Sequence, residues 1–176
     1  MIALFFLGIL FLCHSHATLS ESSKGDYPDA NEVMWMLPET YMLQSGRSYP
    51  TLLCGYQVFF NSTSRGQTYK KYDLYFFYKN GKFINQPLYV KNVTGYTVYM
   101  GTRPEAELAP TRELQILFSD MESCMIAKNP NPAFPNACSL MVKKDKFSAP
   151  PEICARKFTQ HCKSQGFKYT IQNCPK

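Results

Sequence analysis

The chain has 176 residues, a net charge of +6, 45% hydrophobic residues and 18% charged residues. A single domain usually has about 100–200 residues, and this hydrophobic fraction suits a folded core, so the composition excludes a wholly disordered chain. The mean hydropathy of −0.27 excludes a protein with many membrane spans. The basic residues are scattered along the chain, which argues against nucleic-acid binding.

An apolar run at the N-terminus predicts a secretory signal peptide. Residues 2–12 form an uninterrupted run of 11 apolar residues, whereas a membrane-spanning helix needs about 20. Residues 15–17 then read Ser-His-Ala, a pattern that signal peptidase can cleave. We therefore expect residues 1–17 to be a signal peptide and residues 18–176 to form one secreted domain with no membrane attachment. A buried N-terminal helix is the alternative.

The cysteine count agrees with secretion. Cleavage removes Cys13 and leaves six cysteines, which in an oxidising compartment predict three disulfides but do not by themselves select a pairing. Two glycosylation sequons begin at Asn61 and Asn92, and we expect both asparagines to carry glycans on exposed turns. The six remaining cysteines are Cys54, Cys124, Cys138, Cys154, Cys162 and Cys174.

The first structured element is expected to be a short helix. Residues 18–29 are polar and read as a loose leader, and Asp29 can then cap a helix that continues to Leu37 and stops at Pro38. The segment from 39 to about 142 is mainly of strand type.

Hydrophobic alternation identifies the clearest strand. Residues 71–78 place one set of side chains on a single face, and Asn80-Gly81 supplies a hairpin turn after them. The side chains on that face are Tyr72, Leu74, Phe76 and Tyr78. Further short strands are expected at 88–90, 96–100, 114–118 and 139–142.

A second helix is expected to begin at Pro150-Pro151 and to run to about Lys163, because proline is tolerated in the first helical turn. Seven or eight short strands with a helix near each end predict a mainly β domain, an antiparallel sheet closed into a barrel. Closure removes exposed sheet edges, and a barrel of about eight strands can hold one small ligand. A β-sandwich is the alternative.

The histidine content argues against an enzyme. After cleavage only His161 remains, so a zinc site with two imidazoles is excluded and any histidine-based catalytic site would depend on this one residue. The chain has no phosphate-binding glycine-rich loop and no HExxH or GxSxG motif. We expect a binding protein without catalytic residues, metal or cofactor. An enzyme would need His161 or a pair of carboxyl groups.

Three stations in the C-terminal half carry a family resemblance. They read Cys124-Met125-Ile126, Ser139-Leu140-Met141 and Cys154, with 12 residues in each gap. Together with the segment 117–124, the cysteine-bearing helix and Cys174, they resemble the salivary lipocalins of ticks, the histamine-binding family. That family shows a Cys-Asp-aliphatic triplet, a Glu-Leu-Trp/Tyr triplet and a further cysteine. The resemblance implies an eight-stranded antiparallel lipocalin-type barrel with an N-terminal and a C-terminal helix.

The resemblance also implies the disulfide pairing. It pairs Cys54 with Cys174 and Cys124 with Cys154, which leaves Cys138 with Cys162. If Met125 and Ser139 point into the barrel, their neighbours Cys124 and Cys138 point outward, toward a helix packed outside.

The stations depart from the family's amine-binding pattern. Met125 and Ser139 stand where that pattern has carboxylates, and Met141 stands where it has an aromatic residue. Since a buried carboxylate is stabilised by pairing with a cation such as an ammonium group, losing both disfavours histamine or serotonin. An eicosanoid or another apolar mediator is therefore expected ahead of a biogenic amine.

One acid remains near the stations. Asp120 shares strand parity with Ile116 and Phe118, so it is expected to face the cavity and to receive an amine; the alternative is that the strand has ended and Asp120 caps a turn. For an acidic lipid the candidate cations are Arg47, Arg65, Arg103 and Arg112. The expected ligand-binding residues are Trp35, Phe76, Tyr78, Phe118, Asp120, Met125, Ser139 and Met141.

The function implied by the resemblance is capture rather than turnover. We expect a secreted monomer that sequesters a small-molecule host mediator of inflammation or haemostasis and so assists immune evasion. The alternative is a salivary effector that binds a host protein, such as a complement or clotting component, through its surface loops.

Overall fold

The computed structural model describes residues 24–64, 66–172 and 174, so the expected signal peptide lies outside the described residues. Within these ranges no helix is long and apolar enough to cross a membrane. The elements are β1 (Gly25–Asp26), α1 (Ala30–Met36), β2 (Glu39–Ser45), β3 (Leu52–Ser64), β4 (Gln67–Tyr78), β5 (Phe83–Gln86), β6 (Tyr89–Thr94), β7 (Thr97–Gly101), β8 (Arg112–Ser119), β9 (Cys124–Lys128), β10 (Cys138–Val142), a 3₁₀ turn (Lys144–Lys146), α2 (Glu152–Cys162) and β11 (Phe167–Lys168).

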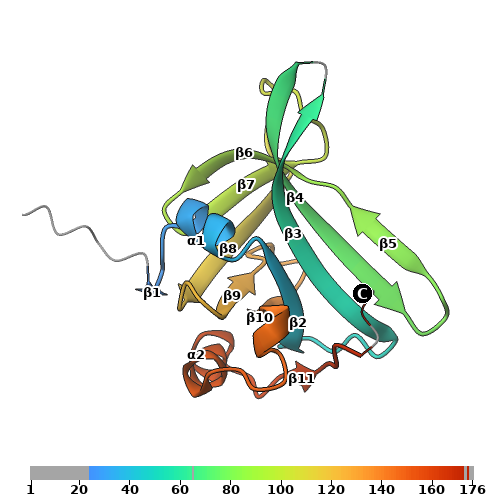
Figure 1. The fold of residues 1–176 in the computed structure, drawn as a ribbon, viewed down its shortest axis with the longest axis vertical. Helices are drawn as coiled ribbons and strands as arrows, with labels where there is room; N and C mark the ends of the chain where they lie inside the picture. The colour runs from blue at the N-terminus through green and yellow to red at the C-terminus, as the bar shows by residue number, and fades with distance from the viewer. Residues whose placement is uncertain (1–23, 65, 173, 175–176) are drawn as a thin grey trace, which may run out of the picture.

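Eight antiparallel strands form a closed ring in the order β2, β3, β4, β6, β7, β8, β9, β10 (Figure 1). The pairing of β8 with β9 and of β10 with β2 completes the ring, which confirms the barrel over the sandwich. The three short strands add to its outside: β1 pairs with β8, β5 with β4, and β11 with β2. Part of the segment expected to be a loose leader is therefore ordered against the barrel.

Helix α1 covers one end of the barrel, next to β6, β7 and β8 (Figure 1). It begins as expected, because Oδ1 of Asp29 accepts a hydrogen bond from the backbone N–H of Asn31 at 2.8 Å. It ends before Pro38, also as expected. The buried side chains that it and its C-cap contribute to the inner core are Ala30, Val33, Met34 and Leu37.

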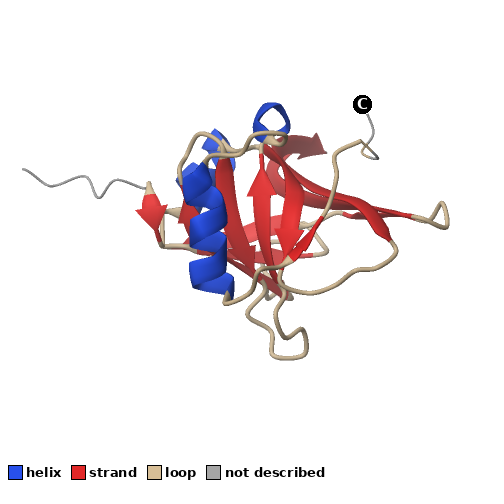
Figure 2. Cartoon of the chain, turned by 90° about the horizontal axis from the view of Figure 1, so that it is seen from below, coloured by secondary structure: helices blue, strands red, loops and turns tan. Residues whose placement is uncertain are grey.

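Helix α2 packs on the outside of the barrel against β8, β9 and β10 (Figure 2). Disulfides Cys124–Cys154 and Cys138–Cys162 join it to β9 and β10, with Cα separations of 6.3 and 5.7 Å. The third disulfide, Cys54–Cys174, joins the C-terminal tail to β3. These three pairings are the ones that the family resemblance implies.

Strand alternation divides the buried side chains into two groups. An inner group inside the barrel includes Phe59, Tyr72 and Met125. An outer group between the barrel and α2 includes Leu140 of β10 and Phe158 of α2. Every disulfide cysteine packs in the outer group, so the inside of the barrel contains no sulfur bridge among the described residues.

An irregularity in β8 corrects one expectation about side-chain direction. Ile116 pairs with Ala127, but Phe118 pairs with Ile126, so Leu117 is an extra residue in the strand. The alternation therefore reverses after Ile116. Phe118 packs in the outer group, where Lys157 of α2 lies 5.6 Å from the centre of its ring, and it does not face the cavity.

The turn after β4 forms as expected, with Gly81 at φ 77° and the side chain of Asn80 accepting a hydrogen bond from the N–H of Lys82. The sequon asparagines are both exposed, but they lie on strands rather than turns: Asn61 on β3 and Asn92 on β6. The strand expected at residues 88–90 corresponds to β6, which continues through Asn92 to Thr94.

A polar contact joins β1 to α2 and predicts a pH effect on stability. Burial raises the pKa of Asp26, but hydrogen bonds from Lys157 and His161 outweigh it and hold that pKa below its usual 3.8. The carboxylate therefore stabilises the fold above pH 3.8, and this contribution is lost as the pH falls below that value. We expect Asp26→Asn to be less stable than wild type at pH 7 and to lose less stability between pH 7 and pH 3.

Urea unfolding at the two pH values checks this expectation. Asp145→Asn is the control, because Asp145 makes only an exposed ion pair with its neighbour Lys146. Identical acid dependence in the wild type and the Asp26 variant would show that the contact does not contribute.

Candidate functional site

A cavity of about 460 Å3 lies inside the barrel. This volume falls within the roughly 300–1,000 Å3 typical of small-molecule sites. None of the residues of α1 lines it, so the helix closes the packed end and the cavity occupies the other end. Its apolar and aromatic lining consists of Met42, Tyr49, Gly55, Tyr56, Tyr72, Leu74, Phe76, Leu88, Met100, Leu114, Ala127, Phe134, Ala137 and Met141.

The polar lining falls into two groups by burial. Arg47 and Arg112 are exposed and Glu113 is half-buried, so the charged groups gather at the open end. Gln57 on β3 is buried, with 1% of its surface exposed. The remaining polar side chains in the lining are Gln86, Asn129 and Ser139.

The phenols of the lining stay neutral at physiological pH. Burial raises the pKa of Tyr72, and it raises that of Tyr49 although the nearby Arg47 opposes the shift. Neither tyrosine can therefore supply an anion to a cationic ligand. Among the described lining residues, the carboxylate comes from Glu113 alone, and it accepts a hydrogen bond from Nε2 of Gln115 at 3.3 Å.

Three of the expected ligand-binding residues line the cavity: Phe76, Ser139 and Met141. Two others belong to the inner group without lining the cavity, since Met125 is fully buried and Tyr78 packs against the group at the end of β4. The directions expected for Met125 and Ser139, and for Cys124 and Cys138, agree with the structure.

Trp35 lies away from the cavity. It stands on the outer side of α1, is 45% exposed, and packs edge-on against Phe59 with 4.7 Å between ring centres. The reason is the phase of the helix, because the face turned toward the barrel already carries Val33 and Met34.

Asp120 also lies away from the cavity, because the strand has ended and the side chain caps the turn between β8 and β9. Its Oδ1 accepts hydrogen bonds from the backbone N–H groups of Glu122, Ser123 and Cys124 at 3.1, 2.7 and 2.9 Å. The alternative interpretation of Asp120 as a turn cap is thus correct, and the expectation that it faces the cavity is wrong.

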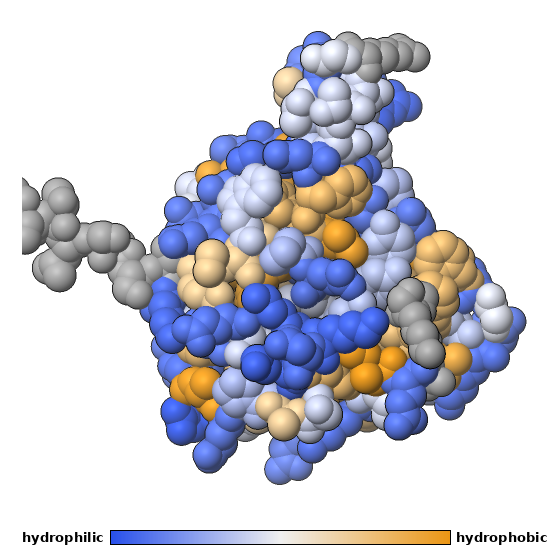
Figure 3. Space-filling model, in the orientation of Figure 1, coloured by the Kyte–Doolittle hydropathy of each residue, from blue (hydrophilic) through white to orange (hydrophobic). Residues whose placement is uncertain are grey.

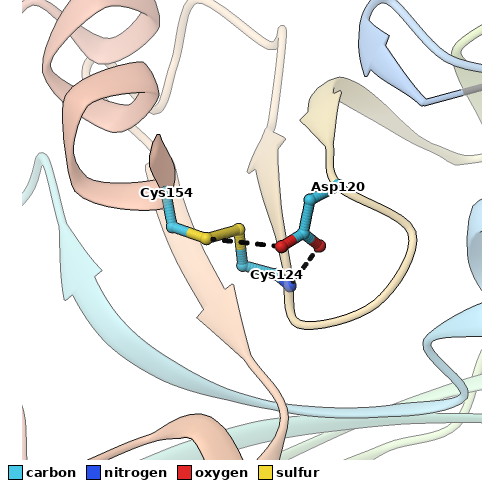
Figure 4. A group of neighbouring side chains, drawn as sticks. All are labelled: Asp120, Cys124 and Cys154. Carbon is cyan, nitrogen blue, oxygen red and sulfur yellow. Dashed lines mark hydrogen bonds between the residues drawn. A yellow bond between two sulfur atoms is a disulfide. The ribbon is translucent and has the colours of Figure 1, made fainter. Parts of the chain in front are cut away.

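The surroundings of Asp120 do not make a metal site. Its Oδ2 lies 3.8 Å from Sγ of Cys154, as Figure 4 shows. Asp120, Cys124 and Cys154 bring three potential ligand atoms within 4.8 Å of one another. Both sulfur atoms are joined in the disulfide, however, so neither can act as a thiolate ligand.

Only some of the candidate cations for an acidic ligand lie at the cavity. Arg47 and Arg112 line the cavity, whereas Arg103 is exposed outside it. Arg65 lies outside the described residues.

Three residues of the cavity wall, Tyr72, Leu74 and Gln57, are absent from the expected ligand-binding residues. Tyr72 and Leu74 share the strand face of Phe76, so the alternation already placed them inside. Gln57 also points inward by alternation, between Gly55 and Phe59 on β3. The sequence did not predict β3 as a separate strand, so the direction of Gln57 was not predicted.

Comparison with known proteins agrees with this architecture. The crystal structure of Per a 4, a major allergen from cockroaches, has a similar fold, with a TM-score of 0.53, 10% sequence identity, and coverage of 77% of this chain and 79% of that one. No curated protein matches the chain. The family described as tick histamine binding protein matches residues 19–175. This chain, a lipocalin-type barrel with an internal cavity, therefore belongs to the tick histamine-binding protein family.

Proposed function

We propose that this protein is a secreted, monomeric salivary lipocalin that sequesters one small host mediator of inflammation or haemostasis and so assists immune evasion. A fatty-acid-derived mediator such as an eicosanoid is the preferred ligand, ahead of a biogenic amine. The observation that carries the proposal is the cavity itself, a mostly apolar space whose charged groups stand at its open end. Family and fold both belong to binding proteins, which supports capture rather than catalysis.

The inner wall lacks what an amine requires. The stations that carry carboxylates in the amine-binding pattern of the family hold Met125 and Ser139 here, and Asp120 is engaged in its turn. An ammonium group buried without a counter-ion loses its hydration without compensation. An amine would have to rely on Glu113, which is only half-buried.

The open end suits an acid. Arg47 and Arg112 both line the cavity and are exposed, so a carboxylate can contact them while it remains partly hydrated. The hydrocarbon part then occupies the apolar space below. A ligand of about twenty heavy atoms reaches nanomolar affinity with only about half a kcal/mol per atom, whereas histamine would need nearly the maximum of ~1.5.

Native mass spectrometry of the secreted protein tests the ligand class. We expect one molecule of arachidonate, a leukotriene or a thromboxane analogue to be retained from a mixture that also contains histamine and serotonin. Retention of an amine in place of every lipid would contradict the preferred class and point to Glu113.

Blocking the cavity tests its location. Ser139 is half-buried on β10 and lines the cavity, so the indole of Ser139→Trp would occupy ligand space. We expect at least a tenfold loss of fatty-acid affinity in titration calorimetry, since overfilled volume must be relieved before a ligand can enter. Lys128→Trp, at an exposed position of the neighbouring β9, is the control. Equal affinities in the two variants would place the ligand elsewhere.

One observation favours a second candidate, the binding of a host protein through the surface. Aromatic rings of Tyr75, Phe77 and Phe83 pack together on β4 and β5, with 4.6 Å between the centres of the last two, and Phe83 is 50% exposed. Figure 3 shows apolar patches among hydrophilic residues on the face viewed there. A protein that acts through its surface would keep its effect on complement or clotting assays after Ser139→Trp.

A further inference from the structure

We propose that the side-chain amide of Gln57 determines specificity by selecting ligands that carry a hydrogen-bond donor, a hydroxyl group, on the part that enters the cavity. The inference rests on the proposed function, the capture of a fatty-acid-derived ligand in the barrel, and names the polar feature that such a ligand has. Gln57 is the most buried polar side chain of the lining.

The hydrogen bonds of Gln57 leave one atom without a partner. Its Nε2 donates to Oγ1 of Thr40, on the neighbouring strand β2, at 2.9 Å. Its Oε1 has no hydrogen-bond partner, and within residues 24–64, 66–172 and 174 it is the one buried side-chain nitrogen or oxygen atom in that state. Proteins rarely keep an unpaired acceptor in the interior, because its lost hydration is not compensated.

The inward positions directly beside and opposite Gln57 carry no side-chain donor. On its own strand the flanking inward positions are Gly55 and Phe59, and the residue opposite on β4 is Leu74. The hydroxyl of Thr40 accepts from the amide nitrogen and makes no hydrogen bond with Oε1. The two arginines of the cavity are exposed at its mouth, so they are placed to meet a different part of a ligand.

The cavity wall can adapt to expose Oε1 to a ligand. The atom has less than 1 Å2 of accessible surface, so a ligand reaches it only if neighbouring side chains move. Met42, Met100 and Met141 belong to the same wall. Methionine side chains are unbranched and rearrange at low cost, which allows the wall to open where a donor is available.

A fatty acid held in this way has a defined orientation. Its carboxylate contacts Arg47 or Arg112 at the open end, its chain follows the apolar wall, and a hydroxyl group on the chain donates to Oε1 of Gln57. A keto group at the same position has no proton to donate and cannot form that bond. The distinction between hydroxyl and keto is therefore the signature of this contact.

Titration calorimetry with three kinds of ligand tests the contact. The ligands are arachidonic acid, a set of its monohydroxy derivatives with the hydroxyl at different positions, and the matching oxo derivatives. We expect the best hydroxy acid to bind wild type at least five times more tightly than both arachidonic acid and its own oxo counterpart. Equal affinity for the hydroxy and oxo forms would overturn the proposal, while binding of all three would leave the proposed function in place.

The variant Gln57→Leu is expected to bind the hydroxy and oxo acids equally and arachidonic acid at least as well as wild type does. Gln44→Leu is the control: Gln44 is also a buried glutamine, but it lies on β2 outside the lining and donates to the carbonyl of Gln165. The control should keep the preference for the hydroxy acid. A preference that persists in Gln57→Leu would assign the recognition to another residue.

If none of the acids binds, the preferred ligand class of the proposed function is rejected, and a measurement without ligand then tests the role of the amide. The double variant Thr40→Val/Gln57→Leu removes both hydrogen-bond partners and also the unpaired oxygen. If the amide is kept for a ligand, this variant unfolds at the same urea concentration as wild type or at a higher one. A clear fall in the unfolding midpoint would show that the pair serves the fold and would overturn the proposal.

Discussion

Asp120→Ala is expected to lower the free energy of unfolding by about 3–5 kcal/mol, because three backbone N–H groups would lose the carboxylate that accepts from them. The side chain is 7% exposed, so water cannot readily replace it. The turn it caps leads directly into Cys124, the residue that holds α2 through its disulfide. Urea unfolding followed by circular dichroism measures the loss.

Two further substitutions separate the causes of that loss. Asp120→Asn keeps an oxygen acceptor but removes the charge, and hydrogen bonds to a charged group are roughly twice as strong as neutral ones, so an intermediate loss is expected. Glu122→Ala, in the same turn, removes only an exposed ion pair with Lys24 and should stay within about 0.5 kcal/mol of wild type. Equal losses in the alanine variants at 120 and 122 would mean that the carboxylate does not hold the turn.

Removing the Cys54–Cys174 disulfide by a double substitution to alanine is expected to cost about 4–5 kcal/mol. The bridge closes a sequence separation of 120 residues, so its loss frees much more of the unfolded chain than the loss of a local bridge does. It also connects the last described residue of the tail to the beginning of β3. Urea unfolding under non-reducing conditions measures the difference.

The matched comparison is the double substitution of Cys138 and Cys162, whose sequence separation is 24. Loop-closure entropy gives about 3–4 kcal/mol for this bridge, less than for the long one. The reverse order of the two losses would show that packing of the sulfur atoms, rather than the length of the closed loop, controls their contribution.

The elements with local signals could be predicted from the sequence. Asp29 and Pro38 bound the first helix because capping and proline geometry act over a few residues. Asn80-Gly81 formed its turn because glycine adopts positive φ freely. The barrel followed from the number of strands and from the family resemblance, and the ring of pairings confirms it.

The candidate site was less predictable, because it depends on strand register. One extra residue, Leu117, reverses the side-chain direction in β8, and nothing in the local hydrophobic pattern announces it. The expected inward direction of Phe118 was wrong for that reason, and that of Asp120 was wrong because β8 ends at Ser119 and Asp120 caps the following turn. Trp35 failed because the aromatic residue of a short amphipathic helix can lie on either side of the buried stripe. Ser139 and Met141 line the cavity because β10 keeps its alternation along both residues.

The long strands β3 and β4 have a consequence for self-association. Beyond Phe59 and before Lys71 they pair with each other and leave the barrel as a two-stranded ribbon, which projects in Figure 1. Such a ribbon presents backbone donors and acceptors along both outer edges, where a second molecule could add a strand. The ribbon is largely hydrophilic in Figure 3, and Asn61 stands exposed on it. A glycan at Asn61 would shield these edges, so the unglycosylated protein should be the form that aggregates in concentrated solution.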